Sequence, residues 1–212
     1  MQKYVLIAAI GLVAYVAYTY IYMRPSPVQT DLPADPTASP LQIRAQGTNT
    51  VDVVRDGKGY RVTKLFAYEV SGQVLMTKSY SIAYTSDFYY VDLALVWGDR
   101  IEDTLRDYQF FQGGRWLFWR TDKPISQAER AYITEHISNN HLMPAEGNAN
   151  IDKAIRWIRT DDYVTIKGYL VSIKGLNDSF SLTSSTTRTD SGNGACEIIW
   201  VEEVKICNRL YQ

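Results

Sequence analysis

The chain has 212 residues, of which 46% are hydrophobic and 21% are charged. A chain of this length and composition buries a sizeable core, so one folded domain with short appendages is expected. The formal net charge of -1 and the lack of a long run of Lys or Arg exclude a strongly basic surface for nucleic acid. Sixteen Tyr and five Trp favour strands as the main framework.

An apolar segment at residues 4–23 is the first predicted element. It contains no charged residue, and as a helix it would cover about 30 Å, the thickness of the hydrocarbon core of a bilayer. A cleaved signal peptide is the alternative. The segment is too long for that, and cleavage after Ala17 would place Tyr15 where a small residue is required. The sequence therefore predicts an uncleaved, single-pass transmembrane helix.

The residues around this helix indicate its placement. Lys3 and Arg24 lie at opposite ends of the helix, so the distribution of positive charge says little about its orientation. We expect a cytoplasmic amino terminus and an extracytoplasmic domain at a bacterial inner membrane. Residues 24–50 contain five prolines among small polar residues, which predicts an extended, solvated linker. We expect a single α+β domain over residues 51–212.

Strand-forming residues dominate the first part of this domain. They fill residues 60–63, 66–70 and 74–80, and an apolar run follows at residues 89–97. Asp92 lies in the middle of that run, where a carboxylate is either on a solvated face or buried with a partner. We expect a buried structural role for Asp92 rather than a catalytic one.

Turn and capping signals predict the middle of the domain. Residues 99–102 resemble a capping box that opens a short helix, and Gly113-Gly114 has the signature of a two-residue hairpin. Residues 126–129 form a second capping box, whose helix is expected to end near Ile137. Asn150 is expected to cap a further amphipathic helix.

Three more strand-like segments complete the domain. Residues 163–174 contain Gly168, which predicts a bulge or sharp bend, and residues 180–185 and 196–206 follow. The expected fold class is α+β, with a small, strongly bent antiparallel sheet or partial barrel, OB-like by analogy, and two or three short helices. The two cysteines would lie about 36 Å apart at the ends of a continuous last strand, beyond disulfide reach.

Two polar segments are the candidate sites, His136–His141 and Arg188–Glu197. Together they hold both histidines and one of the two cysteines of the chain. Their candidate residues are His136, Asn139, His141, Arg188, Asp190 and Glu197. A metal site is not expected, because histidines five positions apart do not share a helix face and no paired-cysteine spacing is present.

A cysteine–histidine pair is the catalytic interpretation of these segments. Cys196 would be the nucleophile, His141 the base, and Arg188 or Arg209 the donor to an oxyanion. The order of anchor, His, Cys and Arg resembles that of membrane-anchored sortase transpeptidases, although the Thr-Leu-x-Thr-Cys pattern of the sortase nucleophile is absent. Glu197 beside Cys196 also disfavours a thiolate.

The structural interpretation assigns the same residues to a buried polar network. His and Asn side chains near the end of a helix can satisfy its last carbonyl groups, and Arg188 can pair with Asp190 across a turn. Buried networks of this kind commonly fix a core. We therefore expect the His136–His141 segment to pack against the Arg188–Glu197 loop, without a metal or a cofactor.

Three motifs, in this order along the chain, resemble those of one protein family. They are Asp92–Gly98, His136–Ala145 and Ser184–Glu197. The family is a widespread one of uncharacterised bacterial proteins, often with an N-terminal membrane segment. The resemblance covers about residues 51–206 of this chain. It implies that the shared polar residues form a site or a scaffold, and it implies no particular activity.

The expected function is that of a non-catalytic binding or assembly module at the membrane. Its partners would be the lipid bilayer, through residues 4–23, and a protein at the membrane, with no nucleic acid. The alternative is a Cys-dependent hydrolase or transpeptidase that acts on envelope material. The reactivity of Cys196 separates the two, because a catalytic thiolate is accessible and reactive.

Overall fold

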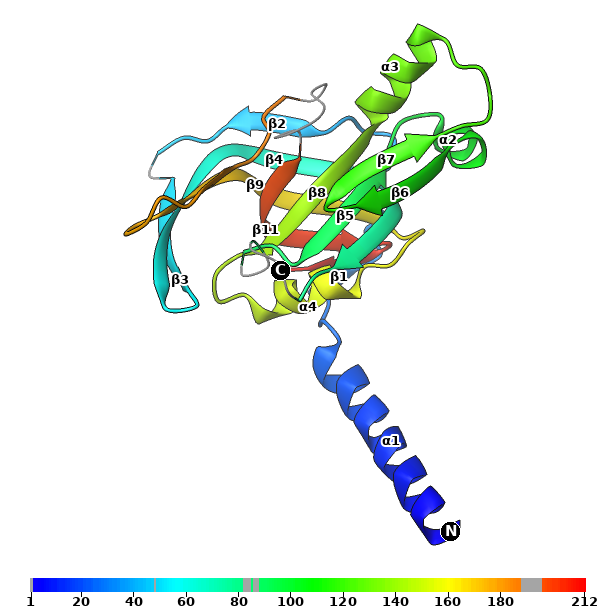
Figure 1. The fold of residues 1–212 in the computed structure, drawn as a ribbon, viewed down its shortest axis with the longest axis vertical. Coiled ribbons are helices and arrows are strands. Elements are labelled where there is room, and N and C mark those ends of the chain that lie inside the picture. Colours follow the sequence, from blue (N-terminus) through cyan, green and yellow to red (C-terminus); the bar gives the residue numbers. More distant parts are fainter. Residues whose placement is uncertain (1, 48, 82–84, 86–87, 188–195) are drawn as a thin grey trace.

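The computed structural model describes residues 2–47, 49–81, 85, 88–187 and 196–212, and its fold is α+β as expected (Figure 1). The helices are α1 (Gln2–Met23), α2 (Ile101–Asp107), α3 (Gln127–His136) and α4 (Ala149–Trp157). The strands up to α3 are β1 (Gln29–Thr30), β2 (Leu41–Arg44), β3 (Thr50–Arg55), β4 (Lys58–Ser79), β5 (Val91–Val96), β6 (Gln109–Gly113) and β7 (Trp116–Arg120). The later strands are β8 (Ile137–Pro144), β9 (Tyr163–Gly175), β10 (Ser181–Thr183), β11 (Glu197–Ile206) and β12 (Arg209–Tyr211).

Ten of the described strands form one strongly bent sheet, and β6 and β7 form a separate hairpin. The path through the sheet is β1-β12-β11-β8-β5-β4-β9-β10, with β2 and β3 added along β4. The bend is confirmed, and the sheet is not a closed barrel. The prediction of a small, purely antiparallel sheet is wrong, because β8 and β11 pair in parallel. The hydrophobic pattern did not reveal β8, whose central residues are polar.

The two faces of the sheet carry two separate cores. One face packs against α4 and contains apolar residues of β5, β8 and β11. The opposite, concave face carries a second cluster, formed mainly by Tyr60, Val62, Phe88, Tyr89, Met143, Ile198 and Trp200. The β6–β7 hairpin reaches residues of this concave face and lies beside β5 and β8 in Figure 1.

Close backbone approach explains the glycine in β9. A Cβ at Gly168 would overlap the carbonyl oxygen of Trp200 on β11. β9 pairs with β4 on one side and β11 on the other, and β11 has an irregularity between Val201 and Glu203 opposite this point. A bulge therefore lies at this point of the sheet, but it is in the partner strand β11 rather than in β9.

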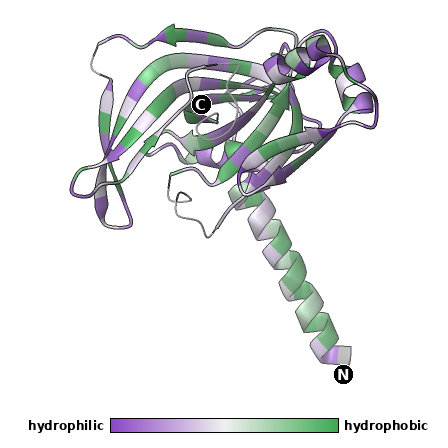
Figure 2. Cartoon of the chain, turned by 45° about the horizontal axis from the view of Figure 1, so that its top comes forward, coloured by the Kyte–Doolittle hydropathy of each residue, from purple (hydrophilic) through white to green (hydrophobic). Residues whose placement is uncertain are grey.

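Helix α1 extends away from the rest of the chain, and Figure 2 shows hydrophobic residues along its length. Lys3–Met23 has a mean hydropathy of 1.9 and is long and apolar enough to cross a membrane. The prediction that residues 24–50 form a solvated linker is wrong in one respect. Backbone pairing incorporates β1 and β2 from this segment into the sheet, against β12 and β4.

The capping predictions have mixed outcomes. The box at Ser126 is confirmed, with both reciprocal hydrogen bonds present. The box at residues 99–102 is wrong, because α2 begins after Arg100 without a side-chain cap and Asp99 instead accepts a hydrogen bond from the Tyr132 hydroxyl at 3.0 Å. Asn148, rather than Asn150, caps α4.

The β6–β7 hairpin is confirmed, but its loop is shifted by one residue. Gly113 pairs with Trp116 at the end of the ladder, so the two-residue loop is Gly114-Arg115. Both loop residues have positive φ, 55° and 71°. This is the backbone twist of the tight hairpin turns that glycine and asparagine usually occupy, and an arginine there is unusual.

Candidate functional site

Strand register brings Asp92, His141 and Cys196 to one face of the sheet. Asp92 on β5 lies directly opposite His141 on β8. On the other side of β8, Asn140 is paired with Glu197 and His141 with Ile198 of β11. Cys196 immediately precedes this ladder, beside Asn139. Because alternate residues of a strand share a face, all three side chains point to the concave face.

The carboxylate of Asp92 holds the imidazole of His141. Nδ1 of His141 lies 2.7 Å from Oδ1 of Asp92, and the two residues are 6% and 0% exposed. Tyr89 stacks on the imidazole, with ring centroids 4.6 Å apart and planes inclined by 13°. The buried, paired state predicted for Asp92 is therefore confirmed.

The same imidazole also interacts with Cys196. Burial of the ring lowers the pKa of His141, but hydrogen bonds to Asp92 and to Cys196, with the charges of both groups, outweigh it and raise that pKa to about 9. Since Nδ1 is used by Asp92, Nε2 is the nitrogen left for the sulfur. At neutral pH the ring is therefore an imidazolium, bonded to the carboxylate of Asp92 and on the same face of the sheet as the sulfur of Cys196.

The β6–β7 hairpin supplies two further partners for Asp92, one from its loop and one from β6. Nη1 of Arg115 lies 3.0 Å from Oδ1, and Nε2 of Gln112 lies 3.1 Å from Oδ2. The guanidinium also lies over the Tyr80 ring, 3.9 Å from its centroid. Within the described residues, the buried Nη2 of Arg115 has no hydrogen-bond partner. The unusual backbone at Arg115 is thus explained by a side chain that must reach a buried carboxylate.

Asn139 connects the hairpin to the sulfur. Its Nδ2 donates to the backbone oxygen of Arg115 at 2.8 Å and lies 3.5 Å from Sγ of Cys196. Its Oδ1 accepts from Gln112 at 3.3 Å. These bonds hold an amide N–H within reach of any group that attaches to the sulfur.

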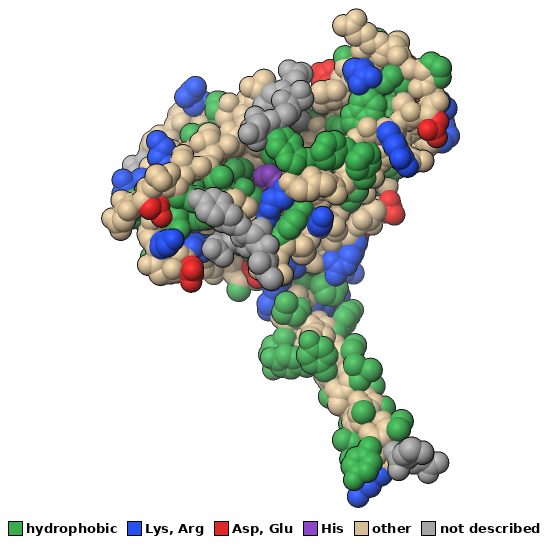
Figure 3. Space-filling model, in the orientation of Figure 1, with side chains coloured by type: hydrophobic (Ala, Val, Ile, Leu, Met, Phe, Trp, Pro, Cys, Tyr) green, Lys and Arg blue, Asp and Glu red, His purple; other side chains and the backbone are tan. Residues whose placement is uncertain are grey.

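Cys196 is half-buried and its backbone is fixed. The amide of Ser185 donates to the Cys196 carbonyl at 3.0 Å, and the hydroxyl of Ser184 accepts from the amide of Ile198 at 3.0 Å. On the face drawn in Figure 3, a histidine is visible beside a basic side chain, between hydrophobic side chains. With intermediate burial, Cys196 itself is partly exposed to solvent.

The structure separates the other predicted site residues from this cluster. His136 ends α3, where its ring stacks on Tyr132 at 3.9 Å and its Nδ1 bonds the Tyr132 carbonyl. Glu197 is buried, and strand alternation directs it to the face opposite Cys196. Arg209 pairs with Ile206 at the far end of β11, so it is not an oxyanion donor for Cys196.

Some predictions about this site lie outside the described residues. Arg188 and Asp190 belong to the loop at 188–195, so their proposed pairing and their contact with His136–His141 stay predictions. Between the described residues of the two segments, the structure shows one contact, from Nδ2 of Asn139 to Sγ of Cys196 at 3.5 Å. In the described part of the chain, no group of three His, Cys, Asp or Glu residues could hold a metal ion.

Sequence reasoning missed Arg115, Gln112 and Tyr89 and undervalued Asp92. The one local signal was a carboxylate in an otherwise apolar strand, the pattern of a buried ion with a specific partner. Nothing in the local sequence marks Arg115, because its role depends on a turn that lies next to the sheet only in the folded chain.

Comparisons with protein-family models, with curated proteins and with solved structures find no match for this chain. The chemical capacity of the site is therefore argued from its geometry. A nucleophile beside a base, with the base oriented by a third group, is the arrangement that activates a side chain for covalent catalysis. Cys196, His141 and Asp92 occupy these positions.

Proposed function

We propose that this protein is a membrane-tethered, cysteine-dependent enzyme that transfers or hydrolyses acyl groups, with Cys196 as nucleophile. The observation that carries the proposal is the placement of a carboxylate, an imidazole and a thiol on one face of the sheet. His141 bonds Asp92 through Nδ1 at 2.7 Å, strand pairing brings Cys196 to the same face, and the proximity of Cys196 contributes to the raised pKa of His141. A positive imidazolium stabilises a neighbouring thiolate, which is the nucleophilic form of cysteine.

The reaction follows from these positions. The Cys196 thiolate attacks a carbonyl carbon, and a carbon–sulfur bond forms as the carbonyl electron pair moves to oxygen. When the tetrahedral intermediate collapses, the proton on Nε2 of His141 goes to the leaving amine or alcohol, which leaves a thioester on Cys196. Water or a second amine then attacks the thioester carbonyl and gives its proton to His141, and the thiolate leaves.

Two groups are placed to stabilise the oxyanion. Nδ2 of Asn139 lies 3.5 Å from the sulfur, so it is close to the position that the reacting carbonyl would take. The Nη2 of Arg115 is the second candidate, because it is buried and has no hydrogen-bond partner among the described residues. Preorganised donors of this kind lower the barrier because charge develops directly in front of them.

Selective acylation of Cys196 tests the proposal. The detergent-solubilised full chain is treated with p-nitrophenyl acetate, and acetyl adducts are located by peptide mass spectrometry. We expect Cys196 to acylate at least about tenfold faster than the exposed Cys207. Cys207→Ala is the matched control and should retain p-nitrophenol release, whereas Cys196→Ala should abolish it.

The result that contradicts the proposal is equally direct. If Cys196 in the folded chain reacts no faster than Cys207, the cluster is a structural scaffold. The protein would then be the non-catalytic binding or assembly module that the sequence also suggests.

The membrane part of the proposal places α1 across a bacterial inner membrane, with the domain on the extracytoplasmic side. Its support is the length and hydropathy of α1. Mass spectrometry of the mature protein should show an N-terminus before residue 17. Protease added to spheroplasts should degrade the domain. If the domain is instead protected until the cells are lysed, it lies on the cytoplasmic side and the proposed orientation is wrong.

A further inference from the structure

A second surface lies where α1 meets the domain. The side chain of Asn150 accepts from the amide of Ser26 at 2.8 Å and donates to the carbonyls of Ser26 at 2.9 Å and Gln212 at 3.0 Å. This fixes the chain just after α1 to the first turn of α4. The Tyr20 ring also meets the Trp157 ring edge-on, with centroids 5.8 Å apart. The α4 side of the domain is therefore held next to the end of α1.

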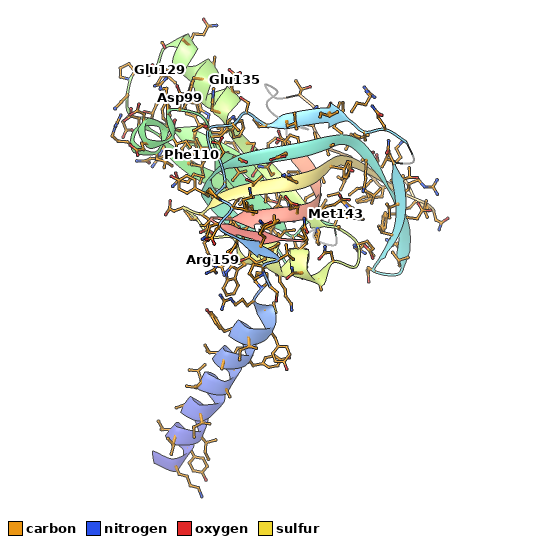
Figure 4. The ribbon with its side chains drawn as sticks, turned by 180° about the vertical axis from the view of Figure 1, so that it is seen from behind. Asp99, Phe110, Glu129, Glu135, Met143 and Arg159 are labelled. Carbon is orange, nitrogen blue, oxygen red and sulfur yellow. The ribbon has the colours of Figure 1, made fainter. Side chains whose placement is uncertain are left out.

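Basic and aromatic side chains gather on this surface, which we call the α4-end surface. It consists of Arg24, Arg156, Trp157, Arg159 and Arg209. Figure 3 shows Lys and Arg side chains where the domain meets α1, and Figure 4 places Arg159 there from behind. Arg24 lies over Tyr20 at 5.7 Å and Arg159 lies over Trp157 at 5.6 Å.

Acidic groups neutralise only part of this charge. Asp152 pairs with Arg156 at 3.3 Å, and Asp162 accepts from the backbone amide of Arg159. The Arg159 guanidinium donates to the carbonyls of Arg156 and Ile158 at the end of α4. Within the described residues, no carboxylate forms an ion pair with the side chains of Arg24, Arg159 or Arg209.

A pocket lined by two of these arginines makes part of the surface concave. It has a volume of about 320 Å³ and is lined by Trp157, Arg159, Asp162, Ile206, Cys207, Asn208, Arg209 and Tyr211. Arg159 and Arg209 thus share one concave surface with an indole. Guanidinium groups bind phosphate with several directed hydrogen bonds, and Trp and Tyr side chains are typical of the headgroup region of membranes.

We propose that the α4-end surface rests on the headgroup layer of the membrane and binds anionic phospholipids. A helix that spans the bilayer and ends at Met23 brings Arg24 and the adjoining α4 to headgroup depth. Basic side chains next to a membrane helix attract anionic lipid, and Trp157 supplies the interfacial aromatic group. The inference rests on the proposed membrane span of α1 and is independent of any chemistry at Cys196.

One consequence concerns the catalytic cluster. α4 packs on one face of the sheet, and Asp92, His141 and Cys196 lie on the other. Lipid binding by the α4-end surface therefore turns the concave face away from the bilayer. The substrate would then come from the aqueous side of the membrane.

Cys207 is a natural reporter for this contact, because it is exposed and lines the same pocket. The full chain with Cys196→Ala is placed in nanodiscs of phosphatidylcholine, alone or with one third phosphatidylglycerol. Labelling of Cys207 by a water-soluble maleimide is then timed. We expect labelling to be about tenfold slower in the anionic discs, and high salt to remove most of the difference.

A matched pair of variants identifies the arginines responsible. Arg159→Gln with Arg209→Gln should restore fast labelling in anionic discs. Arg120→Gln with Arg130→Gln removes two exposed charges from β7 and α3 and should leave Cys207 protected. Thermal melts of both double variants confirm that each is folded.

Two results would overturn the inference. One is a Cys207 labelling rate that is the same in both kinds of disc, whether fast or slow, and the other is protection that survives the Arg159 and Arg209 changes. A chain that does not insert into discs at all would instead count against the proposed membrane anchor. None of these results bears on acylation of Cys196, so the two proposals fail separately.

Discussion

Replacing Asp92 by asparagine removes one negative charge from the buried cluster and nearly preserves its shape. The pKa of His141 is raised from 6.5 to about 9, which corresponds to about 3 kcal/mol in favour of the imidazolium. The ring is only 6% exposed, so burial opposes its charge. Without the carboxylate, burial outweighs the remaining interactions, and the pKa of His141 should fall below its ordinary value.

The consequence is measurable at the sulfur. At about pH 7.5 the ring would change from mostly charged to mostly neutral, and a thiolate at Cys196 would lose its neighbouring cation. Alkylation by iodoacetamide, followed by peptide mass spectrometry from about pH 5 to 9, should show Cys196 reacting at least about tenfold more slowly near neutral pH.

Two references calibrate this measurement. Cys207 is exposed in the same chain and should react alike in both proteins. Asp99→Asn is the matched control variant, because Asp99 precedes α2 and accepts a hydrogen bond from the Tyr132 hydroxyl on α3 at 3.0 Å. An Asp92→Asn protein that is folded and alkylates at Cys196 with the wild-type rate and pH profile would refute the coupling between imidazole and sulfur.

Other changes test stability. Because folding raises the pKa of His141 to about 9, its stabilising effect is complete below about pH 6.5 and is lost as the pH rises through 9. Urea titrations should show the free energy of unfolding falling by about 3 kcal/mol over that range, and His141→Gln should remove this slope. Gly168→Ala should lower stability by about 3 kcal/mol, because its Cβ overlaps the Trp200 carbonyl, whereas Gly113→Ala, with nothing nearer than 3.6 Å, should melt nearly as wild type. Ser126→Ala removes a confirmed capping box and should cost about 1 kcal/mol in the same titrations; an unchanged midpoint would contradict it.

Local physical signals were sufficient for several elements. An uninterrupted apolar segment predicted α1, and a reciprocal Ser–Glu box predicted the start of α3 at Ser126. Aromatic runs around Gly113 predicted the β6–β7 hairpin. Each of these signals depends on residues that are a few positions apart. These elements can therefore be predicted from the sequence without knowledge of the tertiary structure.

The central strand β8 shows where local patterns fail. Ser138, Asn139, Asn140 and His141 are polar, so the sequence does not resemble a buried strand, yet all four are less than 9% exposed. Most of their polar atoms have partners on β5, on β8 itself or in the hairpin, which lowers the usual cost of burying polar groups. Within the described residues, the buried Oδ1 of Asn140 has no hydrogen-bond partner. The pattern of hydrophobicity carries no information about such partners.

The sequence by itself determined the apolar helix, the capping box at Ser126, the β6–β7 hairpin, the strand-forming runs, and the polar segments in which a site would lie. Only the tertiary structure decided which polar residues meet. His141 is 49 positions from Asp92 and Asn139 is 57 from Cys196, and strand register alone aligns them. A shift of one residue in that register would turn the side chains to the opposite face, and no local propensity distinguishes the two registers. Arg115 joins the cluster for the same reason, through a tight turn whose place above β5 and β8 exists only in the folded chain.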